Sequence, residues 1–206
     1  AEVGPKTKPF GWPRRNPFIQ PLTERTVRNG LQRFPHVSLL AGHEVQNLKQ
    51  DADGVTLTVK TAEGEKTLRA RYVVGCDGGR STIRKLLDIK LVGDTHPWRW
   101  LVIDVRNDDR FEPYSAIYCD PHRPCMVIDL PYGHRRFEFR LKHDETEEQM
   151  SKPEEIERLL RTRLGPDEKP DIIRARIYTH HSRVADRFGK GRVFIAGDAA
   201  HLPPPF

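Results

Sequence analysis

The sequence predicts a mixed α/β (α+β) fold, in which a parallel sheet with a ligand-binding edge is combined with an antiparallel sheet. Residues 193–196 are a continuous apolar run, typical of a parallel strand buried on both faces, and Gly197 and Asp198 follow it directly. Residues 98–142 hold four short β-like runs separated by Asn, Asp, Pro and Gly. Three further runs within residues 38–79 are typical of a β-meander that leads into a second buried strand.

Composition narrows the class of protein and its partners. The chain of 206 residues is 36% hydrophobic and 31% charged, as expected for a globular protein of one large or two small domains. Its net charge of +6 comes from interleaved signs without a helix-turn-helix or aromatic-basic pattern, so an anionic small molecule is a better partner than nucleic acid. No long apolar run or leader indicates a membrane partner or secretion. Three cysteines make no disulfide framework, which favours the cytoplasm.

The first part of the chain predicts a loop and one helix. Residues 1–21 are rich in Pro and Gly and cannot begin a fold alone. Thr23 is a candidate N-cap for a helix that ends before the next proline. This helix would carry Val27, Leu31 and Phe34 on one face.

Three more elements are predicted further along. A Gly-Gly turn precedes Ser81, which would cap a short helix. Ser151 and Pro153 would open a second helix, and Gly165 would close it. Residues 171–185 are expected to form a long strand that leads into the terminal one.

Two strand-turn motifs carry the chemistry. In "VVGCDGGRSTIR", an apolar strand leads to Asp77 and a helix capped by Ser81. Backbone N–H groups at such a turn can face a phosphate while the carboxylate reaches a hydroxyl, although an ordinary βα turn has the same pattern. In "GDAAH", Asp198 follows the terminal strand. Because ligands bind at the carboxyl ends of strands in open α/β sheets, both motifs indicate a site at that edge.

The ordered pair "GCDGxxSxxR" and "GRVFIAGDAAHxxPP" resembles the flavoprotein aromatic hydroxylases of the para-hydroxybenzoate hydroxylase class. The segments between the motifs look most like its 3-(3-hydroxyphenyl)propionate hydroxylase branch. The resemblance implies part of an FAD-binding Rossmann-like domain joined to an antiparallel-sheet substrate domain. It also implies a monooxygenase that converts a phenolic substrate to a catechol with FAD, NADH or NADPH, and O₂. A non-catalytic FAD-binding module of the same fold and a relative with another substrate stay open as alternatives.

The resemblance also implies roles for individual residues. Asp198 would accept a hydrogen bond from a ribose-side hydroxyl of FAD, Asp77 would serve both FAD and the nicotinamide cofactor, and Gln20 would contact the flavin. Pro204 and Pro205 would line the isoalloxazine and substrate side. No catalytic side chain is assigned. The implied cofactor-binding residues are Gln20, Asp77, Gly78, Ser81, Arg84, Gly197, Asp198, Ala199, Ala200 and His201.

The resemblance divides the chain and suggests that more sequence surrounds it. Residues 1–95 would be part of the FAD-binding domain with the meander, 96–185 the substrate-binding sheet and helix, and 186–206 the return strand. The class carries a GxGxxG fingerprint, which these residues lack, and "GQG" after the prolines, where Phe206 ends this chain. The chain is therefore expected to be an internal segment, inactive alone, of an enzyme that could form a homo-oligomer.

Other features have competing interpretations. The segment 119–125, "CDPHRPC", offers three zinc ligands at most, so a strand-to-strand turn is favoured over a metal site. His180 and His181 alternate faces of a strand and are expected to be one core and one surface histidine. Arg14 and Arg15 are a phosphate-binding candidate, with a solvated pair favoured. A methyltransferase-like Rossmann unit would need a Gly-rich turn after its first strand, where this chain has a meander.

Overall fold

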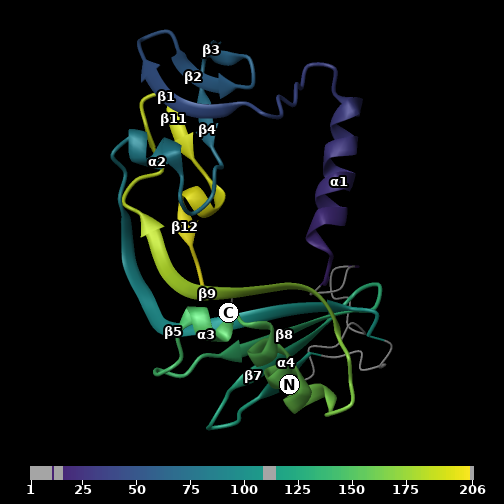
Figure 1. The fold of residues 1–206 in the computed structure, drawn as a ribbon. Helices are drawn as coiled ribbons and strands as arrows, with labels where there is room; N and C mark the ends of the chain where they lie inside the picture. The colour runs from purple at the N-terminus through teal and green to yellow at the C-terminus, as the bar shows by residue number, and fades with distance from the viewer. Residues whose placement is uncertain (1–10, 12–15, 109–114, 205–206) are drawn as a thin grey trace. The chain divides into compact units, whose positions relative to one another are not determined.

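The fold is taken from a computed structural model that describes residue 11, residues 16–108 and residues 115–204 (Figure 1). The chain divides into two units. Unit 1 comprises residues 1–37 and 98–178, and unit 2 comprises residues 38–97 and 179–206. Within the described part of the chain, the helices are too short and too polar to cross a membrane.

Unit 2 contains the predicted meander. Strands β1 (Glu44–Gln50), β2 (Val55–Thr61) and β3 (Gly64–Ala70) pair antiparallel in the order β1-β2-β3. The first strand begins at Glu44 and not at the start of the predicted range 38–79, because a turn that includes Gly42 at φ +70° precedes it. The meander itself is confirmed.

A second, three-stranded sheet of unit 2 forms the expected parallel pair. Its strands are β4 (Val73–Gly75), β10 (Gly189–Lys190) and β11 (Val193–Ile195), in the order β10-β11-β4. Strand β11 runs parallel to β4. The expectations that β11 is buried on both faces and that β4 is a buried strand are wrong, since Val74 of β4 is 58% exposed. Val193 and Ile195 are buried, but Phe194 is 44% exposed, because only one face of this short sheet packs against the core of unit 2.

The core of unit 2 fixes the helix that follows β4. Helix α2 (Thr82–Leu86) is capped by Ser81, as predicted. Ile83 packs against β4 so closely that a Cβ on Gly75 would lie 2.7 Å from the Ile83 Cβ atom, so this strand position requires glycine. The buried core consists of Val55, Ile83, Leu87, Ile89, Ala185, Val193, Ile195, Ala199 and Ala200.

Unit 1 is built on the predicted antiparallel sheet. Its strands are β5 (Leu91–Arg106), β6 (Ala116–Tyr118), β7 (Cys125–Leu130), β8 (His134–Arg140) and β9 (Asp171–Ala185), in the order β9-β5-β8-β7-β6. Strands β5 and β9 are long enough to contribute residues to both units. The final strand, β12 (His201–Leu202), pairs with the unit 2 part of β9.

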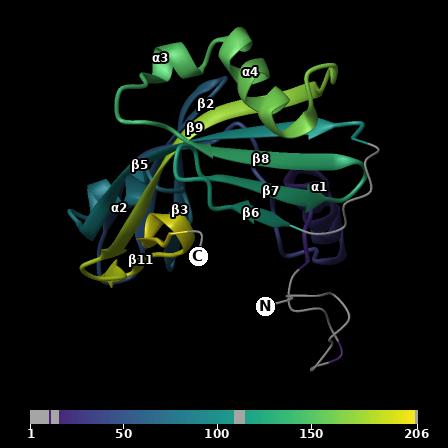
Figure 2. The ribbon, with the colours of Figure 1, turned by 90° about the horizontal axis from the view of Figure 1, so that it is seen from below.

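Two helices cover one face of the unit 1 sheet (Figure 2). Helix α3 (Glu147–Met150) precedes α4 (Pro153–Leu164), which ends at Gly165 with φ +109°, as predicted. The cap residue of α4 is Lys152 rather than Ser151, because Pro153 occupies the first helical position. The buried core consists of Leu101, Ile103, Val105, Cys125, Val127, Phe137, Phe139, Leu141, Met150, Ile156, Leu159 and Leu160.

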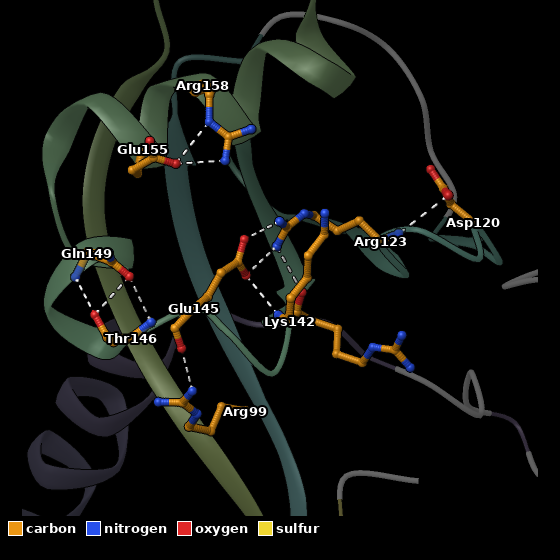
Figure 3. Close-up of polar contacts among 10 residues, drawn as sticks. Arg99, Asp120, Arg123, Lys142, Glu145, Thr146, Gln149, Glu155 and Arg158 are labelled. Carbon is orange, nitrogen blue, oxygen red and sulfur yellow. Dashed lines mark hydrogen bonds and ion pairs between the residues drawn. The ribbon is translucent and has the colours of Figure 1, made fainter.

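A polar network holds the loop between β8 and α3 against the unit 1 sheet (Figure 3). Arg123 Nη1 donates to Glu145 Oε2 at 2.9 Å, and the Lys142 N–H donates to the same oxygen at 2.8 Å. Arg99 Nη2 donates to the Glu145 carbonyl at 2.6 Å. Partial burial raises the pKa of Glu145, but these charged and N–H donors outweigh it and lower the pKa overall.

Helix α1 (Gln20–Gly30) and the 3₁₀ turn Leu31–Arg33 also belong to unit 1. The predicted cap at Thr23 is wrong. Because Pro21 lies in the first turn, the helix begins earlier with Ile19 as its cap residue, and Thr23 Oγ1 donates to the Ile19 carbonyl at 3.4 Å. None of the residues of α1 is buried.

Candidate functional site

The two motif turns follow neighbouring parallel strands of unit 2. The Ala196 N–H donates to the Gly75 carbonyl at 3.0 Å, so β4 and β11 end side by side. Asp77 comes two residues after β4, and Asp198 comes three residues after β11. Residues far apart in sequence therefore meet at the carboxyl edge of one small sheet, which is where ligands bind in open α/β sheets.

The Asp77 carboxylate is engaged within its own turn. Its Oδ1 accepts from Ser81 Oγ at 2.5 Å, and its Oδ2 accepts from the Ile83 N–H at 3.0 Å. Ser81 Oγ in turn accepts from the Arg84 N–H at 2.9 Å. Partial burial raises the pKa of Asp77, but the hydrogen bonds from Ser81 and Ile83 outweigh it, so the pKa lies below its ordinary value. The turn is thus rigidly joined to the start of α2.

Arg84 joins the two turns. Its side chain is buried, with Nη1 donating to the Ala199 carbonyl at 2.9 Å and Nη2 donating to the Gly79 carbonyl at 2.7 Å. Because Nη1 and Nη2 donate to backbone carbonyls of different turns, Arg84 positions the two turns relative to each other. Its contact with a cofactor, implied by the resemblance, stays a prediction.

The Asp198 turn is closed by its backbone and leaves its carboxylate exposed. Gly197 has φ +58°, a conformation that favours glycine, and the Ala200 N–H donates to the Gly197 carbonyl at 2.8 Å. Ala199 and Ala200 are buried in the unit 2 core, which anchors the turn. Asp198 is exposed, and its carboxylate has no hydrogen bond or ion pair with any residue that the structure describes.

This edge is open to a ligand at both turns. A Cβ placed on Gly78 or on Gly197 would have no atom of a described residue within 4 Å, so a ligand can approach the backbone of both turns. The Asp198 carboxylate is a charged acceptor of the kind that a ribose hydroxyl requires. The residues of these two turns are therefore the ones that would hold part of the FAD that the resemblance implies.

A cavity of about 290 Å³ in unit 2 adjoins the Asp198 turn. His201 begins β12 and lines this cavity together with Pro204, while Pro205 lies outside the described residues. The lining residues are Ser182, Arg183, Val184, His201, Pro203 and Pro204. Sequence reasoning missed Arg183, because nothing in its local pattern distinguishes it from the other basic residues among the 35 lysines and arginines.

Other candidate residues lie elsewhere. Gln20 begins α1 in unit 1, where its Nε2 donates to Glu24 Oε1 at 2.9 Å. Arg14 and Arg15 lie outside the described residues. Cys125 is buried in the unit 1 core, and burial raises the pKa of its thiol to about 11. Among the residues that the structure places, no three His, Cys, Asp or Glu side chains gather closely enough to hold a metal ion.

The predicted division of His180 and His181 into one core and one surface residue is wrong. Both are half-buried. His181 Nδ1 lies 3.0 Å from Thr95 Oγ1. Burial, together with the neighbouring His96 and His181, lowers the pKa of His180.

Comparison with known proteins identifies the class. Residues 3–206 match the family described as FAD binding domain, and the chain belongs to this family. A 3-(3-hydroxy-phenyl)propionate/3-hydroxycinnamic acid hydroxylase of Burkholderia cenocepacia (strain HI2424) is 50% identical over 207 residues, covering 100% of this chain and 38% of the relative. The corresponding protein of Comamonas testosteroni is 47% identical over 205 residues, covering 99% of this chain and 35% of the relative. The chain thus spans little more than a third of the length of these curated relatives.

Solved structures that resemble this chain include flavin-dependent monooxygenases. The p-nitrophenol 4-monooxygenase PnpA from Pseudomonas putida DLL-E4 is 29% identical, with a TM-score of 0.78 over 91% of this chain and 49% of that one. The flavin-dependent monooxygenase PieE, solved in complex with FAD and substrate, is 26% identical, with a TM-score of 0.81 over 90% of this chain and 34% of that one. These similarities confirm the predicted mixed α/β fold of the FAD-binding aromatic hydroxylases.

Proposed function

We propose that this chain provides much of the FAD site and the substrate site of a flavoprotein monooxygenase. Its substrate would be a phenolic acid of the 3-(3-hydroxyphenyl)propionate type, converted to a catechol with O₂ and with NADH or NADPH as the reductant. The observation that carries this proposal is the pair of Asp turns at the ends of two neighbouring parallel strands. The chain that contains them is 50% identical, over its whole length, to a protein named 3-(3-hydroxy-phenyl)propionate/3-hydroxycinnamic acid hydroxylase.

Most of the residues that would hold the cofactor belong to unit 2. Asp198 would accept a hydrogen bond from a ribose-side hydroxyl, because its carboxylate is exposed and accepts no hydrogen bond from a residue that the structure describes. Arg84 would keep the two turns in register through its bonds to the Ala199 and Gly79 carbonyls. The other cofactor residues expected here are Gly78, Ser81, Gly197, Ala200 and His201. Asp77 would contribute the cap that orders its turn, and Gln20 of unit 1 a flavin contact.

The bound flavin would supply the oxidising chemistry, in which one oxygen atom of O₂ is added to the ring and the other leaves as water with electrons from NADH or NADPH. The chain itself would bind and orient the phenol and keep water from the reacting ring. Pro204 and the cavity beside it would form part of the substrate side. The antiparallel sheet of unit 1 would form the substrate domain.

We also propose that the protein acts in the cytoplasm as a small-molecule enzyme without a nucleic-acid partner. Its three cysteines, Cys76, Cys119 and Cys125, are all free thiols, which suits a reducing compartment.

The test is to express the chain together with the sequence that flanks it in its gene, and to record flavin content and reductant oxidation. We expect a yellow protein whose NADH or NADPH oxidation is stimulated by 3-(3-hydroxyphenyl)propionate and yields a catechol. A flavin-containing protein whose reductant consumption ignores phenolic acids would instead be a non-catalytic FAD-binding module.

A further inference from the structure

The cavity beside the Asp198 turn has one cationic wall and one apolar wall. Strand β12 pairs with β9 so that Leu202 lies opposite Arg183 and His201 opposite Val184. The chain after β12 then brings Pro203 and Pro204 to the cavity. None of its six lining residues is acidic, so no carboxylate of the lining offsets the charge of Arg183.

The half-buried side chain of Arg183 makes no hydrogen bond or ion pair with a residue that the structure describes. Its Nε atom is buried. Arg84, by contrast, donates to two carbonyls, and Arg123 pairs with Glu145. A buried donor of a charged group without an acceptor destabilises the fold, and an anionic ligand in the cavity would offset that cost.

The backbone around Arg183 is held firmly. A Cβ on Gly93 of β5 would lie 2.1 Å from the Ser182 carbonyl oxygen, so the two strands approach each other more closely than any side chain would allow. The Ala185 N–H donates to the Ala200 carbonyl at 2.7 Å, which joins this part of β9 to the Asp198 turn. Arg183 therefore has a fixed place next to the turn that would hold the cofactor.

We propose that Arg183 binds the carboxylate of the phenolic acid and thereby selects acids over neutral phenols of the same shape. A guanidinium donates to a carboxylate through charge-assisted hydrogen bonds, while prolines provide an apolar wall for the ring and side-chain carbons. This inference rests on the proposed function, because it concerns the substrate of that same site.

The experiment uses the flavin-loaded protein, expressed with its flanking sequence, and compares 3-(3-hydroxyphenyl)propionate with 3-(3-hydroxyphenyl)propan-1-ol. Dissociation constants are measured from the change in the flavin spectrum, and KM and kcat from reductant oxidation. Arg183→Met should weaken binding of the acid about 10- to 100-fold while changing binding of the alcohol less than about twofold. Arg183→Lys should restore part of the acid preference, because it keeps the positive charge. Arg187→Met is the matched control, since Arg187 is exposed in the same unit and should alter neither constant.

Three outcomes would overturn the inference: an unchanged acid preference in Arg183→Met, equal weakening of acid and alcohol, or loss of FAD from both Arg183 variants. The last would assign the guanidinium to the cofactor. Failure of the proposed function looks different, because the unaltered protein would then show no substrate-stimulated reductant oxidation at all, and this inference would fall with it.

Discussion

The turns after β4 and β11 have similar sequences, but their aspartate carboxylates differ in hydrogen bonding. Both follow neighbouring parallel strands, and both combine Asp with glycine. Both carboxylate oxygens of Asp77 accept hydrogen bonds from Ser81 and Ile83, whereas the Asp198 carboxylate accepts none from a described residue. A strand followed by Asp and Gly therefore does not by itself identify a ligand contact, because the carboxylate can already accept hydrogen bonds from within the protein.

The physical reason lies in the backbone on the carboxyl side of each turn. A helix begins after Asp77, and its first N–H groups have no intrahelical acceptors, so the carboxylate and Ser81 satisfy them. No such helix starts at Asp198 in the described chain. Its turn is closed between Ala200 and Gly197, leaving the side chain available to a ligand.

The largest effect is expected from replacing Arg84, the residue that joins the two turns. Arg84→Met should lower the free energy of unfolding by about 3 kcal/mol, because charged hydrogen bonds to the Ala199 and Gly79 carbonyls are lost together. Urea denaturation of the full protein measures it. Arg80→Met, which removes an exposed arginine nearby, is the control and should change the unfolding free energy by less than about 0.5 kcal/mol. Equal stability of the two variants would show that the turns are held without Arg84.

The second effect separates the Asp198 turn from the Asp77 turn. Asp198→Ala should weaken FAD binding by about 1–3 kcal/mol, because a charged acceptor is lost, while leaving the unfolding free energy of the flavin-free protein nearly unchanged. Flavin retention on desalting and titration of the flavin-free protein with FAD measure it. Undiminished FAD affinity in this variant would remove Asp198 from the cofactor site.

The third effect concerns Asp77, whose substitution should lower the stability of the protein. Asp77→Ala should cost about 1 kcal/mol of unfolding free energy, as expected for the loss of a partly exposed cap at the start of α2. If the implied contact with the nicotinamide cofactor also exists, stopped-flow measurement should find flavin reduction slowed more than the later oxygen reaction. Unchanged reduction together with lower stability would make the turn purely structural.

The smallest effect is a pH dependence carried by the Asp77 cap. The folded-state pKa of this carboxyl lies below its ordinary value of 3.8, so its contribution is present above pH 4 and is lost as the pH falls through the lowered pKa. Because Asp77 is exposed in part, the contribution should be less than about 1 kcal/mol. Urea denaturation between pH 7 and pH 3 should show a shallower loss of stability in Asp77→Asn than in the unaltered protein. Parallel curves for the two would contradict the role of the ionised cap.

Much of the fold was predictable from local pattern. The β-like runs within residues 38–79 predicted the meander, Ser81 predicted the start of α2, and Gly165 predicted the end of α4. These predictions succeed because strand alternation, N-capping and positive φ are decided by residues close together in sequence. Errors occurred where two local signals competed, as when Pro21 rather than Thr23 determined the beginning of α1.

The sequence by itself determined the class of fold, the two Asp turns as candidates and the family resemblance, because each depends on short motifs and their order. Only the tertiary structure decided that the Asp77 carboxylate is occupied and that of Asp198 is not, that Phe194 is exposed, and that Arg183 lies in a cavity wall. These properties depend on which distant segments approach one another. Burial and hydrogen-bond partners come from such long-range contacts, which no local pattern of residues specifies.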